Sequence, residues 1–441
     1  PPPPPPPPPF FFLFFRLPPF STLFPYTTLF RSLAILAVSF VACSDESANK
    51  GDSVIVNGPM EVERLVMNIS KSFTSYTRGN IGEFVYPDYY GGMYTNDSGY
   101  PVVLIKGNMA KGKEDMIRRA GSDKFEVESC DYSFNELSEL NSELSDILCE
   151  GNFPDELTWN GVGILVDKNR VSVDLEVCSE ENIQLFKRLI SNSPAIVFGY
   201  GTSIIIDSPV DSDNVNREES NVRSSVLMNP GGKFSSYGVS NNNMYSGSIG
   251  VRGTRGGKSG FVTASHCIPK LTISGGSTGS YRPVYRDGSY CGDCVLSLYS
   301  SGLDLAFVEL FDEYEATRVT EWSKVSLTKD IVSVSSLSAL NVTMNGISTN
   351  NGYRPGKVLA VEQTKTVENR NTPVGVLRFT AKHLVFAQYP SQNGDSGGVV
   401  YTPSGNIAGI HCGSGTTSGY GEHAFFTYAT YIVSSLGVTL Y

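Results

Sequence analysis

From about Val226 to the C-terminus, short runs of Val, Ile, Phe and Tyr alternate with turns rich in Gly, Ser and Asn. Segments 260–263 and 331–334 are two of these strand-like runs. Many short strands separated by turn signals are typical of an all-β protein. We therefore expect a β-barrel domain over residues 226–441, with one helix near its end over 428–436 that Gly437 terminates.

The preceding part of the chain has a different pattern. Apolar residues recur at helical spacing in segments 135–150 and 179–189, and strand-like runs cover 101–106, 161–167 and 171–177. This mixture predicts an α/β domain over residues 51–208. A polar and charged run follows within residues 209–225, and its lack of apolar periodicity predicts an exposed linker that proteases can reach.

The first fifty residues need separate treatment. Residues 1–32 are a Pro- and Phe-rich run without periodicity, which we interpret as a non-native segment and exclude from the fold. Residues 33–50 begin with an apolar run that is too short to span a bilayer but matches the core of a signal peptide, so export is expected. The run leads into Cys43, which resembles a lipoprotein processing site, and the alternative is a plain signal peptide cleaved after small residues.

Charge and cysteine content narrow the range of functions. The chain of 441 residues has a formal net charge of -10 and no Lys/Arg patch, which argues against a nucleic-acid partner. Its eight cysteines permit a few disulfides. The pair Cys291 and Cys294 has no second pair to complete a zinc site, so we expect a disulfide there rather than a metal or redox centre. No metal or cofactor is expected.

Three short strings in the second half carry reactive side chains. His266 follows an apolar strand, where an imidazole is suited to act as a general base. Asp304 lies in an apolar strand, where an unpaired charge would be costly and a partner is therefore required. Ser396 lies in the string 393–398, whose glycines allow a tight turn and let the amides of Gly394 and Ser396 point at a developing oxyanion.

Each string alone also has a plain structural explanation, as a core histidine, a turn aspartate or a flexible loop. Together they occur in the order His, Asp, Ser, which is one of the orders that a nucleophilic triad uses. This order predicts that Ser396 is the nucleophile, that His266 is the base and that Asp304 orients the imidazole.

The strings FVTASHC, LDLAFV and NGDSGG resemble the chymotrypsin family of serine proteases, within it the bacterial branch of streptogrisins, α-lytic protease and glutamyl endopeptidases. The resemblance covers about residues 226–441. It implies two packed six-stranded β-barrels followed by a C-terminal helix. His266 and Asp304 would come from the first barrel and Ser396 from the second, and the protein would be a secreted serine endopeptidase acting on proteins and peptides.

The first half resembles the pro-regions of α-lytic-type proteases at 91–94, at the strand 101–106 and over 161–177. The resemblance implies an inactive precursor, whose α/β pro-domain serves as intramolecular chaperone and inhibitor until the linker is cut. A generic α/β binding domain is the alternative for this half.

Two departures from the family pattern concern cysteines. The cysteine after the triad histidine usually pairs with one in the preceding strand, but Cys267 has no such partner, and Cys291 or Cys294 is the nearest candidate. The family serine that donates a hydroxyl to the triad aspartate is matched here by Cys412, and a thiol is a weaker donor.

The string after the nucleophile resembles the primary pocket of glutamyl endopeptidases. The resemblance implies that His411 and Ser414 receive a substrate carboxylate, that Cys412 and Gly413 line the pocket and that Asn393 adds an amide donor. A preference for Glu or Asp before the scissile bond would follow. Further histidines of that branch are replaced by Val400 and Phe426, with His423 as a substitute, and the alternative is a His411 that fills a pocket for uncharged residues.

Two other function classes stay open at this point. One is a non-catalytic binding module that keeps the barrel fold, and the other is a surface protein tethered at Cys43. The protein is expected to be secreted, either free outside the cell or lipid-anchored to the outer face of a bacterial membrane.

Overall fold

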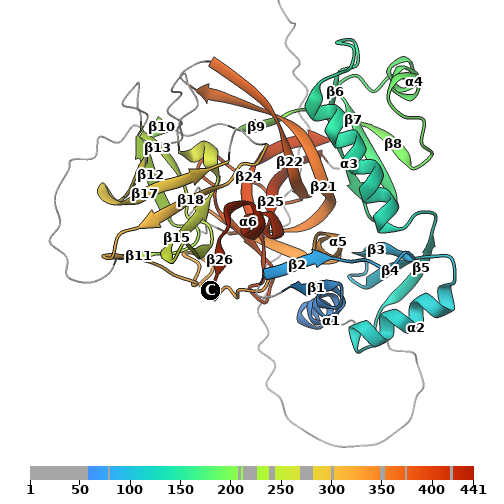
Figure 1. Ribbon diagram of the computed structural model, residues 1–441, viewed down its shortest axis with the longest axis horizontal. Coiled ribbons are helices and arrows are strands. Elements are labelled where there is room, and N and C mark those ends of the chain that lie inside the picture. Colours follow the sequence, from blue (N-terminus) through green and yellow to red (C-terminus); the bar gives the residue numbers. More distant parts are fainter. Residues whose placement is uncertain are drawn as a thin grey trace, which may run out of the picture. The chain divides into compact units, whose positions relative to one another are not determined.

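The computed structural model describes residues 58–77, 80–206, 210–211, 226–237, 244–268, 282–298, 302–347, 353–372, 375–417 and 421–441 (Figure 1). The segments 1–32 and 33–50, with Cys43, lie outside the described residues, as does the predicted linker 209–225 except for residues 210–211. No helix within the described part combines the length and hydrophobicity needed to cross a membrane.

The first α/β unit contains two helices, a hairpin and a small sheet. Its elements are α1 (Pro59–Ser72), β1 (Thr74–Thr77), β2 (Asn80–Phe84), β3 (Tyr90–Thr95), β4 (Pro101–Lys106), α2 (Met109–Ala120) and β5 (Glu126–Cys130). Strand β4 pairs with β3 on one side and with β5 on the other. Asn108 caps the N-terminus of α2, where its side chain accepts a hydrogen bond from the amide of Lys111, and Gly121 with φ +66° caps the C-terminus.

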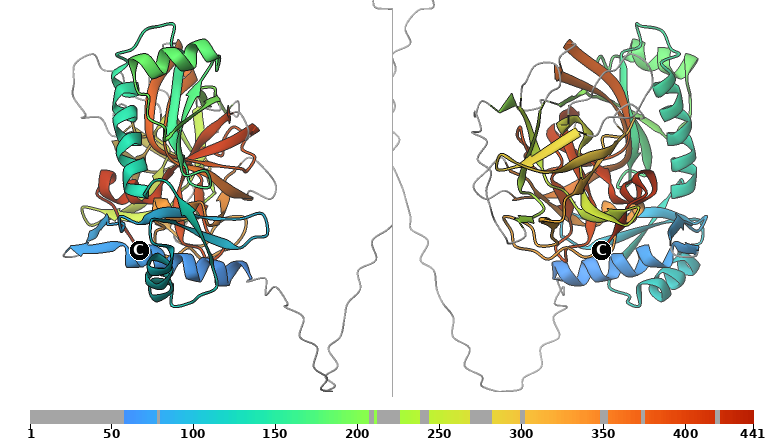
Figure 2. Two further views of the ribbon diagram at one scale, coloured as in Figure 1. Left: turned by 90° about the vertical axis from the view of Figure 1, so that its right-hand side faces the viewer. Right: turned by 60° about the vertical axis from the view of Figure 1, so that its left-hand side comes forward.

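A second α/β unit follows. It consists of α3 (Phe134–Glu150), β6 (Trp159–Leu165), β7 (Arg170–Leu175), α4 (Glu180–Leu189) and β8 (Ile196–Tyr200). Ser133 and Glu136 form a capping box that fixes the start of α3. Strand β7 is antiparallel to β6 and parallel to β8, and the helices pack against these strands (Figure 2).

The rest of the chain is mostly antiparallel sheet. One nine-stranded sheet has the order β10-β13-β12-β16-β17-β18-β15-β14-β26. Its bounds are β10 (Val210–Asp211), β12 (Lys233–Tyr237), β13 (Met244–Ser248), β14 (Arg252–Arg255), β15 (Lys258–Thr263), β16 (Arg282–Arg286), β17 (Ser289–Ser297), β18 (Ala306–Leu310) and β26 (Thr439–Leu440). A separate parallel pair joins β11 (Val226–Met228) and β19 (Tyr314–Ala316).

A ten-stranded sheet joins the two halves of the chain. Its order is β20-β23-β24-β25-β22-β21-β6-β7-β8, and β9 pairs with both β21 and β24. The remaining elements are β9 (Ile204–Ile206), α5 (Val334–Leu337), β20 (Asn341–Asn345), β21 (Tyr353–Thr372), β22 (Gly375–Ala387), β23 (Val399–Tyr401), β24 (Ile407–Thr417), β25 (Gly421–Tyr428) and α6 (Ala429–Leu436). The long hairpin β21–β22 thus carries the sheet from the β-rich part into the α/β part (Figure 1).

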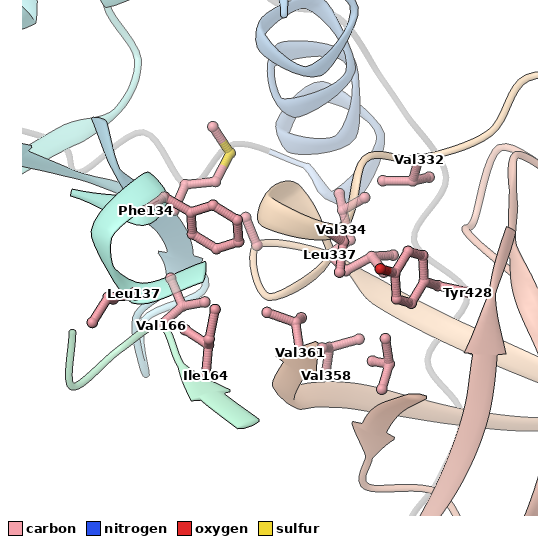
Figure 3. Close-up of a cluster of buried hydrophobic side chains, with 14 of the residues drawn as sticks. Phe134, Leu137, Ile164, Val166, Val332, Val334, Leu337, Val358, Val361 and Tyr428 are labelled. Atoms are coloured by element: carbon pink, nitrogen blue, oxygen red, sulfur yellow. The ribbon is translucent and has the colours of Figure 1, made fainter. Parts of the chain in front are cut away.

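One hydrophobic core runs across this junction (Figure 3). It contains Phe134 and Ile164 from the α/β part and Leu337, Val361 and Tyr428 from the β-rich part. These side chains are almost completely shielded from solvent. Because neither set is covered without the other, the two parts stabilise each other through buried apolar surface.

The predicted fold class, an α/β half followed by an all-β half of two barrels and a C-terminal helix, is confirmed. Helix α6 ends before Gly437 as predicted, and this glycine has φ +62°. The strand predicted over 331–334 is wrong. Ile331 forms only an isolated bridge, and Val334 starts the short helix α5, whose apolar residues are buried in the shared core.

Candidate active site

His266 and Asp304 form a buried pair on the nine-stranded sheet. His266 lies in a single 3₁₀ turn (Ser265–Cys267) directly after β15, and Asp304 lies just before β18, the strand that pairs with β15. Nδ1 of His266 is 2.5 Å from Oδ2 of Asp304. The second oxygen, Oδ1, accepts the amide of His266 at 3.0 Å, so the carboxylate holds both the ring and its backbone.

The opposite charges of His266 and Asp304 shift the pKa of each residue. Burial acts to lower the pKa of His266, but the charge and hydrogen bond of Asp304, together with the neighbouring Cys267, raise it to about 10. Burial alone would raise the pKa of Asp304, but the charge of His266 and the hydrogen bonds to the carboxylate lower it. The geometry therefore favours an imidazolium–carboxylate pair in the intact chain.

The hydroxyl that supports Asp304 comes from a residue that the sequence analysis did not single out. Ser265 Oγ donates to Asp304 Oδ1 at 2.9 Å. Cys412, which was expected to take this role weakly, donates its thiol to the carbonyl of Phe425 at 3.3 Å instead. One indication of this role was available in the sequence, namely that Ser265 directly precedes His266.

Ser396 lies in a tight loop between β22 and β23. The loop contains two residues in the left-handed region, Gly394 with φ +96° and Gly397 with φ +88°. The amide of Gly397 donates to the carbonyl of His411 at 2.9 Å, and the amide of His411 donates to the carbonyl of Gly398 at 2.9 Å. These bonds fix the loop on β24.

Ser248, at the end of β13, ties this loop to the nine-stranded sheet. Its amide donates to the carbonyl of Ser396 at 2.8 Å, and its hydroxyl donates to the carbonyl of Gly394 at 2.8 Å. The thiol of Cys267 is 3.5 Å from the same Ser396 carbonyl. The structure thus brings the serine loop next to the turn that carries His266, although the two lie on different sheets.

The two amides predicted to bind an oxyanion belong to Gly394 and Ser396. Within the described residues, neither the Gly394 amide nor the Ser396 amide donates to a backbone carbonyl. In the same loop, the amides of Asp395, Gly397 and Gly398 each donate to a backbone carbonyl. Preoriented free amides are what stabilisation of a developing negative charge requires.

His411 on β24 is buried, with 1% of its surface exposed. Its Nδ1 is 3.1 Å from the hydroxyl of Tyr389, a residue that carries no recognisable sequence signal. Burial lowers the pKa of His411 to about 4, and the charge of Asp395 only partly opposes this effect. The ring is therefore neutral at neutral pH in the intact chain.

Asn393 and His423, two further residues predicted for the pocket, lie in different surroundings from each other. Asn393 is exposed and lines a cavity of about 450 Å³ with Gly394 and Ile347, and His411 is not in the lining of that cavity. His423 is buried, and its Nδ1 is 2.9 Å from the carbonyl of Gly421. Burial lowers the pKa of His423 to about 4.

A strand from the first half of the chain covers the predicted pocket wall. Strand β9 pairs antiparallel with β24, where Ile205 is opposite Ser414. A side chain at Gly413 would start 2.9 Å from Ile204 Cγ2. The amide of Thr202 extends the pairing by donating to the carbonyl of Thr416 at 3.0 Å. The segment 202–206 therefore pairs along one edge of β24.

The predicted disulfide is not formed. The seven described cysteines are all free thiols. Cys291 donates to the carbonyl of Val284 at 3.2 Å, and Cys294 lies 3.5 Å from the carbonyl of Leu296. The sulfur atoms of these two residues thus point at backbone carbonyls rather than at each other or at Cys267. Across the described residues, no group of three or more His, Cys, Asp or Glu side chains is arranged to hold a metal ion.

Two protein-family models match parts of the first half of the chain. Residues 43–130 match the Pro-like N-terminal domain, and residues 135–201 match the Pro-like C-terminal domain. The predicted resemblance to precursors with such a pro-region is confirmed. The boundaries predicted at 51–208, 209–225 and 226–441 stay predictions.

Several solved structures are similar to the chain. Thermobifida fusca protease A is 24% identical with a TM-score of 0.35, over 49% of this chain and 98% of that one. A chymotrypsin of Cellulomonas bogoriensis is 22% identical with a TM-score of 0.35, and the match covers 49% of this chain and 99% of that one. A third structure is 25% identical with a TM-score of 0.34, and the match covers 49% of this chain and 100% of that one. It is a glutamic acid specific serine protease that uses a histidine triad in substrate binding. A search of curated proteins finds no match.

Proposed function

We propose that this chain, which carries Pro-like domains over residues 43–130 and 135–201, is the precursor of a serine endopeptidase. The observation that carries the proposal is the buried His266–Asp304 pair next to the Ser396 loop. This combination of base, orienting carboxylate and glycine-flanked serine supports acyl transfer.

The proposal assigns each residue a role in the reaction. Ser396 attacks the scissile carbonyl, and His266 takes the hydroxyl proton and passes it to the leaving amine. Asp304 holds Nδ1 of the imidazole and stabilises its positive charge. The amides of Gly394 and Ser396 stabilise the tetrahedral oxyanion. Water then hydrolyses the acyl-enzyme, with His266 as base.

The test is labelling with an organophosphonate probe, which reacts with an activated serine. We expect the matured protein to be labelled at Ser396 and the Ser396→Ala variant to stay unlabelled. Peptide hydrolysis should fall by several orders of magnitude in His266→Ala and by about 10⁴-fold in Asp304→Asn, which stabilises the wrong tautomer. A matured native protein that takes no label would instead favour the non-catalytic binding module.

The precursor is proposed to be inactive because β9 lies along the pocket wall on β24. An added strand of this kind imitates a bound peptide and blocks the edge where a substrate would pair. Proteins and peptides would gain access only after the pro-region leaves. Export, with the mature protein outside the cell, either free or anchored through Cys43, is part of the same proposal because it rests on the signal-like segment 33–50.

A preference for Glu or Asp before the scissile bond is the finer proposal. His411 is neutral and hydrogen-bonded to Tyr389, so a substrate carboxylate beside it would favour the charged imidazolium and gain a charge-assisted bond. Matched peptides with Glu, Gln, Leu or Lys at this position provide the test. We expect a Glu over Gln preference that His411→Ala abolishes, and faster cleavage after Leu or Lys by the native enzyme would contradict it.

A further inference from the structure

Lys365 is a fully buried cation at the junction of the two halves. It lies on β21, and its side chain has 0% relative exposure, although lysine is rarely buried unless it is paired. Its Nζ is 2.5 Å from Oδ2 of Asp174 on β7 and 3.1 Å from Oδ1 of Asn160 on β6. The cation thus comes from the β-rich half, and both of its described oxygen partners come from the Pro-like half.

The Pro-like half has a groove that fits this lysine. A Cβ at Gly161 would lie 2.6 Å from Lys365 Cδ and 2.7 Å from its Nζ. A Cβ at Gly201 would lie 2.8 Å from the same Nζ. Neither glycine has a positive φ, so both are needed for space rather than for backbone conformation. Asn160 closes the groove by donating its amide to the carbonyl of Gly201 at 2.6 Å.

The groove continues along β6. A side chain at Gly163 would overlap the amide of Gln363, which precedes Lys365 by two residues on β21 and is also fully buried. Two long polar side chains of the hairpin therefore insert into a strip of glycines. In an ordinary apolar interface, side chains from both β6 and β21 would fill the space between these two strands.

A second ion pair across the same junction provides a contrast. Lys382 on β22 is 2.7 Å from Asp146 on α3, but the two side chains are 30% and 62% exposed. An exposed pair contributes little, because water screens it. A buried pair is different, since removing one partner leaves an uncompensated charge without water.

We propose that Lys365 and its groove of Asp174, Asn160, Gly161 and Gly201 are the recognition site by which the Pro-like region binds only a protease domain with a long cation at this position. The proposal rests on the proposed precursor function, because it concerns retention of the inhibitor after the linker is cut. A protease domain with an apolar residue at 365 would leave Asp174 buried and unpaired, and a pro-region with larger residues at 161 or 201 would exclude the lysine side chain.

The test uses the full chain with Ser396→Ala and with the recognition sequence of an external site-specific protease inserted in the linker. After cleavage by that protease, the two pieces stay together only through their interface, and their dissociation constant is measured by dilution and size exclusion. We expect Lys365→Met and Asp174→Asn each to raise this constant by about two to three orders of magnitude. The matched control Lys382→Met should raise it less than about fivefold.

A second pair of variants keeps the proposal testable if Lys365→Met fails to fold. Gly161→Ala should weaken retention strongly, whereas Gly199→Ala should leave it unchanged, since a Cβ at Gly199 meets nothing within 4 Å. Retention by Lys365→Met within threefold of native, or equal retention by the two alanine variants, would overturn the proposal. Neither readout depends on peptidase activity, which the probe labelling tests separately.

Discussion

At the scale of single residues, the environment of Asp304 shows how a buried carboxylate is kept charged. It accepts three hydrogen bonds, from the ring and amide of His266 and from the hydroxyl of Ser265. All three donors belong to the 3₁₀ turn Ser265–Cys267, which also carries the base. The turn therefore orients the aspartate and the imidazole together.

This arrangement predicts a difference between two conservative variants. Ser265→Ala removes a donor to a buried charge, and such bonds are worth about 1.5–3 kcal/mol, so kcat/KM of the mature enzyme should fall by roughly tenfold or more. Cys412→Ala should change kcat/KM by less than about threefold, because its thiol bonds to Phe425 instead. The same peptide assay measures both, and a larger loss in Cys412→Ala would restore the role first expected for that residue.

The raised pKa of His266 predicts how the stability of the precursor depends on pH. The folded pKa of about 10 lies above the ordinary 6.5, so the protonated imidazole stabilises the fold. This contribution is fully present below about pH 6.5 and is lost as the pH rises toward 10. The melting temperature of the Ser396→Ala precursor should fall across this window, and the fall should be smaller with Asp304→Asn added. If the melting temperatures of the two proteins fell equally with pH, Asp304 would not be the cause of the raised pKa of His266.

The three triad candidates could be found in the sequence because each lies in a short string that determines its own local geometry. His266 directly follows strand β15, and Asp304 and Ser396 shortly precede strands β18 and β23. Tyr389 could not be found in this way, because its contact with His411 depends on how β24 folds back beside the serine loop. The same limit applies to Lys365, whose partners lie in the other half of the chain.

At the scale of elements, the serine loop depends on close approach between backbones. A Cβ at Gly397 would overlap Thr263 Oγ1 and lie 2.5 Å from the carbonyl of Ser248. Both neighbours belong to the nine-stranded sheet, so the glycine lets the loop contact that sheet. Its φ of +88° adds a second reason for glycine at this position.

Replacing this glycine should therefore be costly. We expect Gly397→Ala to reduce the free energy of unfolding of the precursor by at least about 3 kcal/mol, since strain and overpacking add. Gly437→Ala is the matched control, with positive φ but no atom within 4 Å of its Cβ, and it should cost about 1–2 kcal/mol. Chemical denaturation measures both, and equal losses would show that the loop has room to adjust.

Element prediction succeeded where local pattern and packing agree. Strand β4 and helices α3, α4 and α6 match their predicted segments within about one or two residues, because periodicity and caps mark them. Residues 331–334 were read as a strand because β-branched residues favour strands, but burial of Val334 and Leu337 against the pro-region selects a helical turn. The length of β21 could not be predicted from its own residues, because it depends on pairing with β6 of the α/β part.

At the scale of the whole molecule, the precursor is held by one core and one continuous sheet. Phe134 and Ile164 pack with Val361 and Tyr428, and β6 pairs with β21. The sequence predicted two separate units because composition changes near residue 208. It could not predict their mutual burial, since that depends on which faces the folded units present to each other.

The whole-molecule prediction concerns maturation. If the chain processes itself, Ser396→Ala should accumulate as uncut precursor, whereas Ser434→Ala, a change on the exposed face of α6, should mature normally. N-terminal sequencing of the mature native protein should give a start between residues 208 and 226. A start beyond Gly250 would contradict this prediction, because it would remove β12 and β13 from the nine-stranded sheet.

Departure of the pro-region would leave β21 as a bare edge of its sheet, since β6 is its neighbour on that side. Bare edges recruit strands from other chains and so promote aggregation. A lysine on such an edge discourages recruitment, because joining a second strand would strip water from its charge. Lys365 is buried while the precursor is intact. In the free enzyme it would be exposed and would oppose self-association through this edge.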